Sequence, residues 1–165
     1  MKKITFILFA LIAGTTFAQT TASADAVVKA EIVSPISIDN VSALNFGRII
    51  GGTAGGGLVT VDADVTGARS GAVALIVPGG TVNSAEFTVN ASTEYLYKIT
   101  IPTTDLTAAS SSETMSVVYS SSLGFTNISG LGSAQTLYVG GVLTVGANQS
   151  EDIYSGTATV TVAYE

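Results

Sequence analysis

Hydrophobic and polar residues alternate with a period of two along most of the chain, in runs separated by clusters of Gly, Ser, Asn and Pro. Successive side chains of a β-strand point to opposite faces, so this period predicts strands. The segment 156–164 shows it most clearly, because Ala158, Val160, Val162 and Tyr164 fall on one face. A well-patterned strand at the end of a chain is expected to pair with a neighbour, since free ends otherwise fray.

Eight further segments are alternating runs or short apolar runs of strand length. Strands are predicted at about 22–38, 44–49, 58–65, 72–77, 86–89, 95–101, 115–119 and 136–145. In the last of these, the residues expected to face inward are Leu137, Val139, Gly141, Leu143 and Val145. No segment beyond the first eighteen residues shows a convincing helical period. Short strands separated by turn residues are typical of sandwiches, so the sequence predicts an all-β, immunoglobulin-like Greek-key β-sandwich of roughly eight or nine strands.

The first eighteen residues have the pattern of a secretory signal peptide. Lys2 and Lys3 precede an apolar run at 4–12, and small residues lead to Ala18. We expect cleavage after Ala18, leaving residues 19–165 as a single domain exported to the periplasm, the cell surface or the medium. The apolar run is shorter than the roughly 20 residues that a membrane span needs, so no span is expected.

Charge and composition exclude several functions. Removal of Lys2 and Lys3 leaves four basic residues against twelve acidic ones, and the formal charge falls from −6 to −8. Nucleic acid is therefore not an expected partner. The chain has no His and no Cys, which excludes Ser–His and Cys–His nucleophiles and the usual zinc ligands. We expect no enzyme activity, no catalytic residues, no cofactor and no metal site.

Asp62 and Asp64 lie two residues apart in a predicted strand, where both carboxylates would project from one face. Two acids could contribute to a calcium site, but calcium takes about six or more oxygen ligands and no Asp-rich loop is present. A solvated sheet face explains the pair better. A hydrolase would need a paired set of acids, and no pair stands out.

The segment 22–32 carries an apolar residue at every second position. The six residues on that face are Ala22, Ala24, Ala26, Val28, Ala30 and Ile32. Such a segment can be the first strand of a complete domain, or it can be a donor strand that fills a groove in another copy. The residues leave both alternatives open, although the three alanines would each bury little area.

Five motifs, in this order, resemble the secreted bacterial DUF4402 family, a domain of unknown function. They are Ser34–Ile38, Leu44–Gly47, Tyr97–Pro102, Leu137–Gln149 and Tyr154–Tyr164. The last motif is also distantly similar to spore-coat-U-type and archaic chaperone–usher pilins. That resemblance implies other copies or related subunits as partners through strand pairing, together with a periplasmic chaperone and an outer-membrane usher. Such pilins often carry a disulfide, which this chain lacks.

The sequence therefore favours one function and leaves one alternative. The first is a non-catalytic, fimbrial or coat-like structural subunit that assembles by β-strand addition through 22–32 and the edge beside 156–164. The alternative is a self-contained binding module that holds a glycan or a protein with loops such as 51–57 and 120–133.

Overall fold

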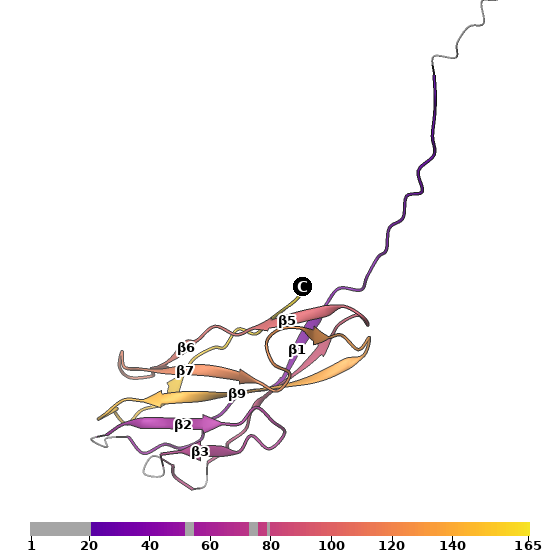
Figure 1. Cartoon of the computed structure of the whole chain (residues 1–165). Helices are drawn as coiled ribbons and strands as arrows, with labels where there is room; N and C mark the ends of the chain where they lie inside the picture. The colour runs from indigo at the N-terminus through magenta and orange to yellow at the C-terminus, as the bar shows by residue number, and fades with distance from the viewer. Residues whose placement is uncertain (1–20, 52–54, 73–75, 79) are drawn as a thin grey trace, which may run out of the picture. The chain divides into compact units, whose positions relative to one another are not determined.

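The computed structural model describes residues 21–51, 55–72, 76–78 and 80–165 (Figure 1). The chain divides into two units, one ending at Ile32 and a compact one from Val33 to Glu165. The predicted signal peptide, residues 1–18, lies outside the described residues.

The compact unit is all-β, with no helix among the residues described. Its strands are β1 (Ser37–Ser42), β2 (Gly57–Val61), β3 (Arg69–Gly71), β4 (Ala85–Asn90), β5 (Leu96–Thr100), β6 (Thr104–Ala108), β7 (Thr114–Ser121), β8 (Ile128–Ser129), β9 (Ala134–Val145), β10 (Tyr154–Ser155) and β11 (Thr161–Tyr164).

The strands form two antiparallel sheets. The large sheet has the order β1-β4-β9-β7-β6-β10, with β2 paired to β9 and β3 paired to β2. The small sheet has the order β11-β5-β8. Strand β9 is the centre of the large sheet: residues 134–139 pair with β4, and residues 141–145 pair with β2. Gly140 separates the two pairings, and a Cβ there would lie 2.2 Å from the carbonyl oxygen of Val61, so only glycine fits.

Two hydrophobic clusters form the core. The first, here called the closed half, lies around Tyr97, Val89 and Leu137, and strands of both sheets contribute to it. The second, here called the open half, lies around Val59 and Leu143 on β2, β7 and β9 of the large sheet. In Figure 1, β7, β9 and β2 follow one another across this half.

The structure confirms the all-β sandwich and four of the predicted strands. The predictions at 86–89, 95–101, 115–119 and 136–145 correspond to β4, β5, β7 and β9. The residues expected to face inward on β9 are buried: Leu137, Val139, Gly141, Leu143 and Val145. Long runs with clear alternation therefore predicted both the strand and its buried face.

Other strand predictions were wrong in extent. The prediction at 22–38 overlaps a strand only from Ser37 onward. The segment 44–49 forms isolated bridges, Asn45 to Asn83 and Ile49 to Ile76, rather than a strand. Strand β2 ends at Val61, and the residues that follow form a turn. Alternation continues past the point where a backbone partner is available, so it overestimates strand length.

The prediction at 72–77 falls partly on residues 73–75, outside the described residues. Within 156–164, only residues 161–164 belong to β11. Sequence patterns missed β3, β6, β8 and β10, three of which have no more than three residues. Strands this short exist because a longer neighbour offers them an edge, and no local signal marks them.

Candidate functional site

The two sheets leave two unpaired strand edges close together. Strand β1 pairs only with β4, and β11 pairs only with β5 among the described strands. The two strands approach each other in space, but no ladder joins them. Residues 157–159, which lead into β11, make no backbone hydrogen bond to another described residue. This side of the sandwich therefore exposes backbone donors and acceptors that a further strand could use.

The edge at 156–164 belongs to a strand pair that passes from one sheet to the other. Thr161 pairs with Thr100 in the small sheet, and Ser155 pairs with Thr107 in the large sheet. Between these two pairs, residues 101–106 of one segment lie opposite residues 156–160 of the other. The segment 101–106 is therefore longer by one residue, and the pairing is interrupted there. Pro102 lies in the longer segment and has no N–H to give to a ladder. The interruption separates the small sheet from the open half.

A groove of about 970 Å³ lies mainly over the open half and extends to Ala85, Phe87 and Val139 of the closed half. Its two walls are residues 40–51, which follow from β1, and residues 149–158, which lead toward β11. Its floor consists of core residues of the large sheet. Apolar residues that line it include Leu44, Phe46, Ile49, Leu106, Met115, Val117, Tyr119, Leu143, Val145 and Tyr154. The groove is thus apolar inside and lies beside the unpaired strand edges.

The first wall is held by Arg69. Its guanidinium Nη1 donates to the carbonyl oxygens of Phe46 at 2.8 Å and Arg48 at 2.9 Å, and Nη2 donates to that of Val77 at 2.7 Å. Gly47 lies between the first two acceptors with φ of 73°, a conformation that favours glycine. A Cβ at this position would lie 2.8 Å from Arg69 Nη1. Glycine therefore lets the wall approach the guanidinium that holds it.

The second wall is held by Glu113, in the turn between β6 and β7. Its carboxylate accepts hydrogen bonds from Ser150 N at 3.0 Å, Ser150 Oγ at 2.8 Å and the Tyr154 hydroxyl at 3.0 Å. Gln149 Nε2 donates to the same carboxylate at 3.2 Å. The bonds from Ser150 N, foremost, from Ser150 Oγ and from the Tyr154 hydroxyl lower the pKa of Glu113 from its ordinary value.

Asp152 adds a second attachment to this wall. Its carboxylate accepts from Ser110 N and from Ile153 N, each at 2.7 Å. The pKa of Asp152 is lowered, mainly by the bond from Ser110 N. Because both walls are fixed to the large sheet by charged side chains, neither needs an occupant in the groove to hold its position. The site is preformed.

The structure places the predicted C-terminal residues along one wall and the adjoining edge. Ala158 lines the groove, whereas Val160, Val162 and Tyr164 pack against the closed half. All four are half-buried, and the threonines at 157, 159 and 161 are exposed. The alternation predicted for 156–164 is therefore present, although the hydrogen-bonded ladder covers only its end.

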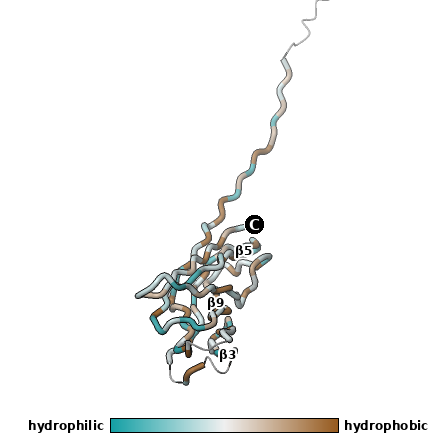
Figure 2. Tube along the Cα trace, turned by 90° about the vertical axis from the view of Figure 1, so that its left-hand side faces the viewer, coloured by the Kyte–Doolittle hydropathy of each residue, from teal (hydrophilic) through white to brown (hydrophobic). Residues whose placement is uncertain are grey.

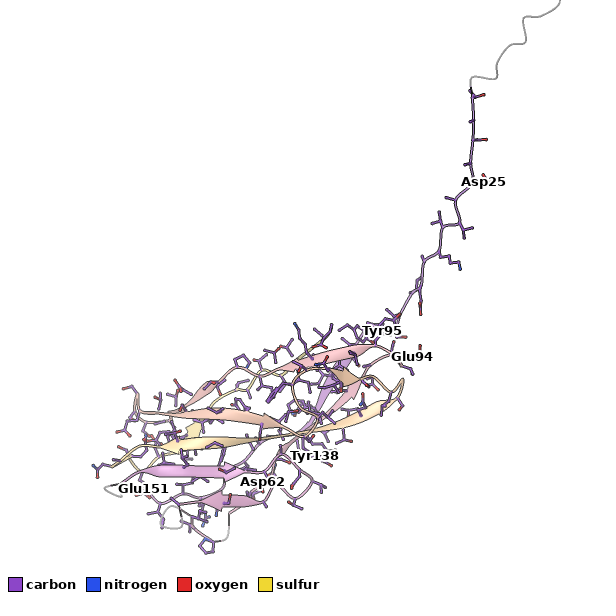
Figure 3. All side chains as sticks on the ribbon, in the orientation of Figure 1. Asp25, Asp62, Glu94, Tyr95, Tyr138 and Glu151 are labelled. Carbon is purple, nitrogen blue, oxygen red and sulfur yellow. The ribbon has the colours of Figure 1, made fainter. Side chains whose placement is uncertain are left out.

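The six predicted N-terminal residues lie in a segment with no secondary structure. All of residues 21–32 are exposed and none belongs to a strand. Val28 is 89% exposed, its neighbour Val27 is 86% exposed, and Ile32 is 97% exposed. Figure 2 shows hydrophobic and hydrophilic positions interspersed along the segment, and Asp25 marks its middle in Figure 3. Its apolar residues are thus without cover, which is uncommon for Val and Ile.

Tyr164 holds the start of the compact unit. Its hydroxyl accepts from Ser92 N at 2.8 Å and donates to the carbonyl oxygen of Ser34 at 3.0 Å. Its ring contacts that of Tyr95 with the centroids 5.8 Å apart. Figure 3 shows Tyr95 and Glu151 at opposite ends of the compact unit. Ser34, near the start of the compact unit, is therefore fixed at the Tyr95 end of that unit, away from Glu151.

The acids considered as calcium ligands lie in a turn rather than in a strand. The Asp64 carboxylate accepts from Thr66 N, Thr66 Oγ1 and Gly67 N, and these bonds, that from Thr66 Oγ1 foremost, lower its pKa. It stabilises the turn after β2. No group of three or more His, Cys, Asp or Glu side chains suited to a metal occurs in the part of the chain that the structure describes.

The loops suggested for a binding module differ in their roles. Residues 52–54 of the loop 51–57 lie outside the described residues. The segment 120–133 contains β8, which pairs with β5, and Ile128 and Leu123 pack into the closed half. The part of the chain that the structure describes contains no long apolar helix of the kind that crosses a membrane.

Comparison with known proteins gives one result. No curated protein and no solved structure matches the chain. The model of a domain of unknown function, DUF4402, matches residues 36–164, which include both groove walls and both strand edges. The chain therefore belongs to the DUF4402 family.

Proposed function

We propose that this protein is a non-catalytic structural subunit of a surface fibre or coat, and that copies assemble by β-strand addition. Segment 22–32 of one copy occupies the groove of the next. One observation carries the proposal: a preformed apolar groove flanked by two unpaired strand edges occurs in the same chain as an exposed segment with the alternation of a strand.

Backbone pairing supplies the first part of the interaction. A strand placed between β1 and the run 156–164 would meet the unpaired edge of each. Residues 157–159 would gain hydrogen-bond partners there. Strand addition of this kind derives affinity from main-chain bonds and specificity from alternate side chains.

Side chains supply the second part. The period of two directs Val28 and Ile32 to the groove while Asp25, Lys29 and Glu31 point away from it. Full burial of a Val or Ile side chain stabilises by roughly 1.5–3 kcal/mol. The charged face remains in water, so no charge is buried.

The proposal extends to localisation and to further partners. The signal-like residues 1–18 support export to the periplasm or the cell surface. An apolar groove between open edges promotes uncontrolled association, so a dedicated periplasmic chaperone that covers it, with an outer-membrane usher, would suit this subunit.

Substitutions at two neighbouring valines test which face of the segment enters the groove. Val28→Asp places a charge on the face that enters the groove, and Val27→Asp places the same charge on the opposite face. Both side chains are almost fully exposed in the single copy, so neither change should alter its stability. We expect Val28→Asp to weaken assembly about thirtyfold or more, since the lost burial is about 2 kcal/mol before the cost of the charge. Val27→Asp should assemble like the unchanged protein.

The measurement is the distribution of oligomers of residues 19–165 by size-exclusion chromatography with light scattering. Equal effects of the two substitutions would contradict the predicted face.

A synthetic peptide of residues 21–33 gives an independent measurement, because it should bind a protein that begins at Val33. If that shortened protein still forms the same oligomers without peptide, segment 22–32 is not the donor.

A further inference from the structure

We infer that the junction between segment 22–32 and β1 restricts the segment to the groove of a second copy and excludes the groove of its own copy. The inference rests on the proposed function and names the partner. Closure within one copy would require residues 33–36 to turn the chain back, so that segment 22–32 forms a hairpin with β1.

The faces of the two segments exclude loops with an even number of residues. Ile36 and Ile38 pack into the closed half, and Ser37 and Asp39 are exposed. Residues opposite each other in a hairpin share a face. A two-residue loop at 34–35 would place Glu31 opposite Ile38, and a four-residue loop at 33–36 would place Ile32 opposite Ser37. Either loop turns the charged face of the segment inward, because a shift of one residue reverses every side chain.

A loop of three residues keeps the apolar faces of the two segments on the same side, but its last position would be occupied by an unsuitable residue. It would span 33–35, with Ile32 opposite Ile36. Three-residue hairpin loops usually end on a residue in the left-handed conformation. That residue is Pro35, whose ring holds φ near −65° and cannot adopt a positive value. A three-residue loop moved to 32–34 or to 34–36 keeps the same faces together, but it needs the left-handed conformation at Ser34, which precedes proline, or at the β-branched Ile36.

Tyr164 adds a second restraint at the same junction. Its hydroxyl bonds the carbonyl of Ser34 at 3.0 Å, and Ser92 Oγ donates to the same oxygen at 3.4 Å. A residue that precedes proline already favours extended backbone. The Ser34 carbonyl is therefore fixed in position where a hairpin would have to bend. Tyr164 acts as a positioning residue, because it acts on the segment through Ser34.

Substitution of Pro35 tests the inference. Pro35→Gly allows the left-handed residue that a three-residue loop needs, and Pro35→Ala removes the proline ring without allowing that conformation cheaply. We expect Pro35→Gly to shift the protein from oligomers to monomers by about tenfold relative to Pro35→Ala, which is the usual penalty of a left-handed L-residue. In those monomers the segment occupies its own groove.

Trypsin reports where the segment is, because Lys29 is its only tryptic site between residues 19 and 47. Monomers of Pro35→Gly should resist cleavage at Lys29, and monomers of Pro35→Ala should be cut and should still bind the 21–33 peptide. Adding Tyr164→Phe to Pro35→Gly should increase the protected monomer further. Tyr138→Phe, on a half-buried tyrosine with no contact to Ser34, is the matched control.

The outcomes separate this inference from the proposed function. If Pro35→Gly forms oligomers as the unchanged protein does, the junction does not select the partner, although strand addition stands. If the unchanged protein is a monomer with a protected Lys29, the segment closes on its own groove and the inference is overturned. If the unchanged protein is a monomer that trypsin cuts at Lys29 and that binds no peptide, the proposed function fails as well.

Discussion

The closed half and the open half share the large sheet but differ in what covers it. Over the closed half, β5, β8 and β11 form a second sheet, and Tyr97 and Leu137 are fully buried between the two. Over the open half, the cover consists of segments 40–51 and 149–158, with the groove between them. The same alternation on one sheet thus produces a closed core at one end and a site at the other.

The two covers also differ in what holds them. The small sheet is held by backbone ladders between its strands. The groove walls have only short backbone pairings, at Asn45, Ile49 and β10, and are held in addition by the side chains of Arg69, Glu113 and Asp152. Short pairings and side-chain attachments fix a wall without pairing its whole length, so backbone groups such as those of residues 157–159 stay available.

The largest contrast should come from leucine truncation in each half. Leu137→Ala in the closed half should lower the free energy of unfolding by about 2–5 kcal/mol, because the buried site cannot collapse fully. Leu106→Ala, at the half-buried floor of the groove, should cost less than half as much. Urea unfolding of monomeric protein measures both. Equal losses would mean that the groove is closed in solution.

An intermediate effect is expected at the first wall. Arg69→Met removes three hydrogen bonds to main-chain carbonyls and should cost about 2 kcal/mol. Hydrogen exchange should rise at 45–49 and stay unchanged in β5. Arg48→Met is the matched control, since the Arg48 side chain is exposed and should change stability by less than about 0.5 kcal/mol. Faster exchange in β5 would show that the halves unfold together.

The smallest effect should be the pH dependence of the second wall. The pKa of Glu113 in the folded protein is below its ordinary value of 4.5. The carboxylate therefore stabilises the fold fully above that value, and this contribution is lost as the pH falls through the lowered pKa. Glu113→Gln should lower the melting temperature at pH 7 and flatten its decline at acid pH.

Asp152 and Asp64 contribute with the same sign, because their pKa values are also lowered. Asp64→Asn provides the control, since it perturbs the turn after β2 and leaves the groove wall intact. It should flatten the acid decline without changing the binding of the 21–33 peptide, whereas Glu113→Gln should weaken that binding. Equal binding by both variants would show that the second wall does not depend on Glu113.

Long alternating runs were predictable because the signal and the structure are both local. Strand β9 shows this, since its inward residues could be identified before its partners were known. The groove could not be predicted in this way. Its walls come from 40–51 and 149–158, a hundred residues apart, and Arg69, Glu113 and Asp152 act through main-chain groups that no residue pattern marks.

Residue alternation alone was enough to predict the all-β class, the buried faces of the long strands and the two-sided pattern of 22–32 and 156–164, because side-chain direction in a strand depends only on position along it. The folded arrangement was needed to show that 22–32 lies outside every strand, that two edges remain unpaired, and that the open half carries a groove between fixed walls. Hydrogen-bond pairing between strands depends on which segments meet in space, and that depends on the whole chain.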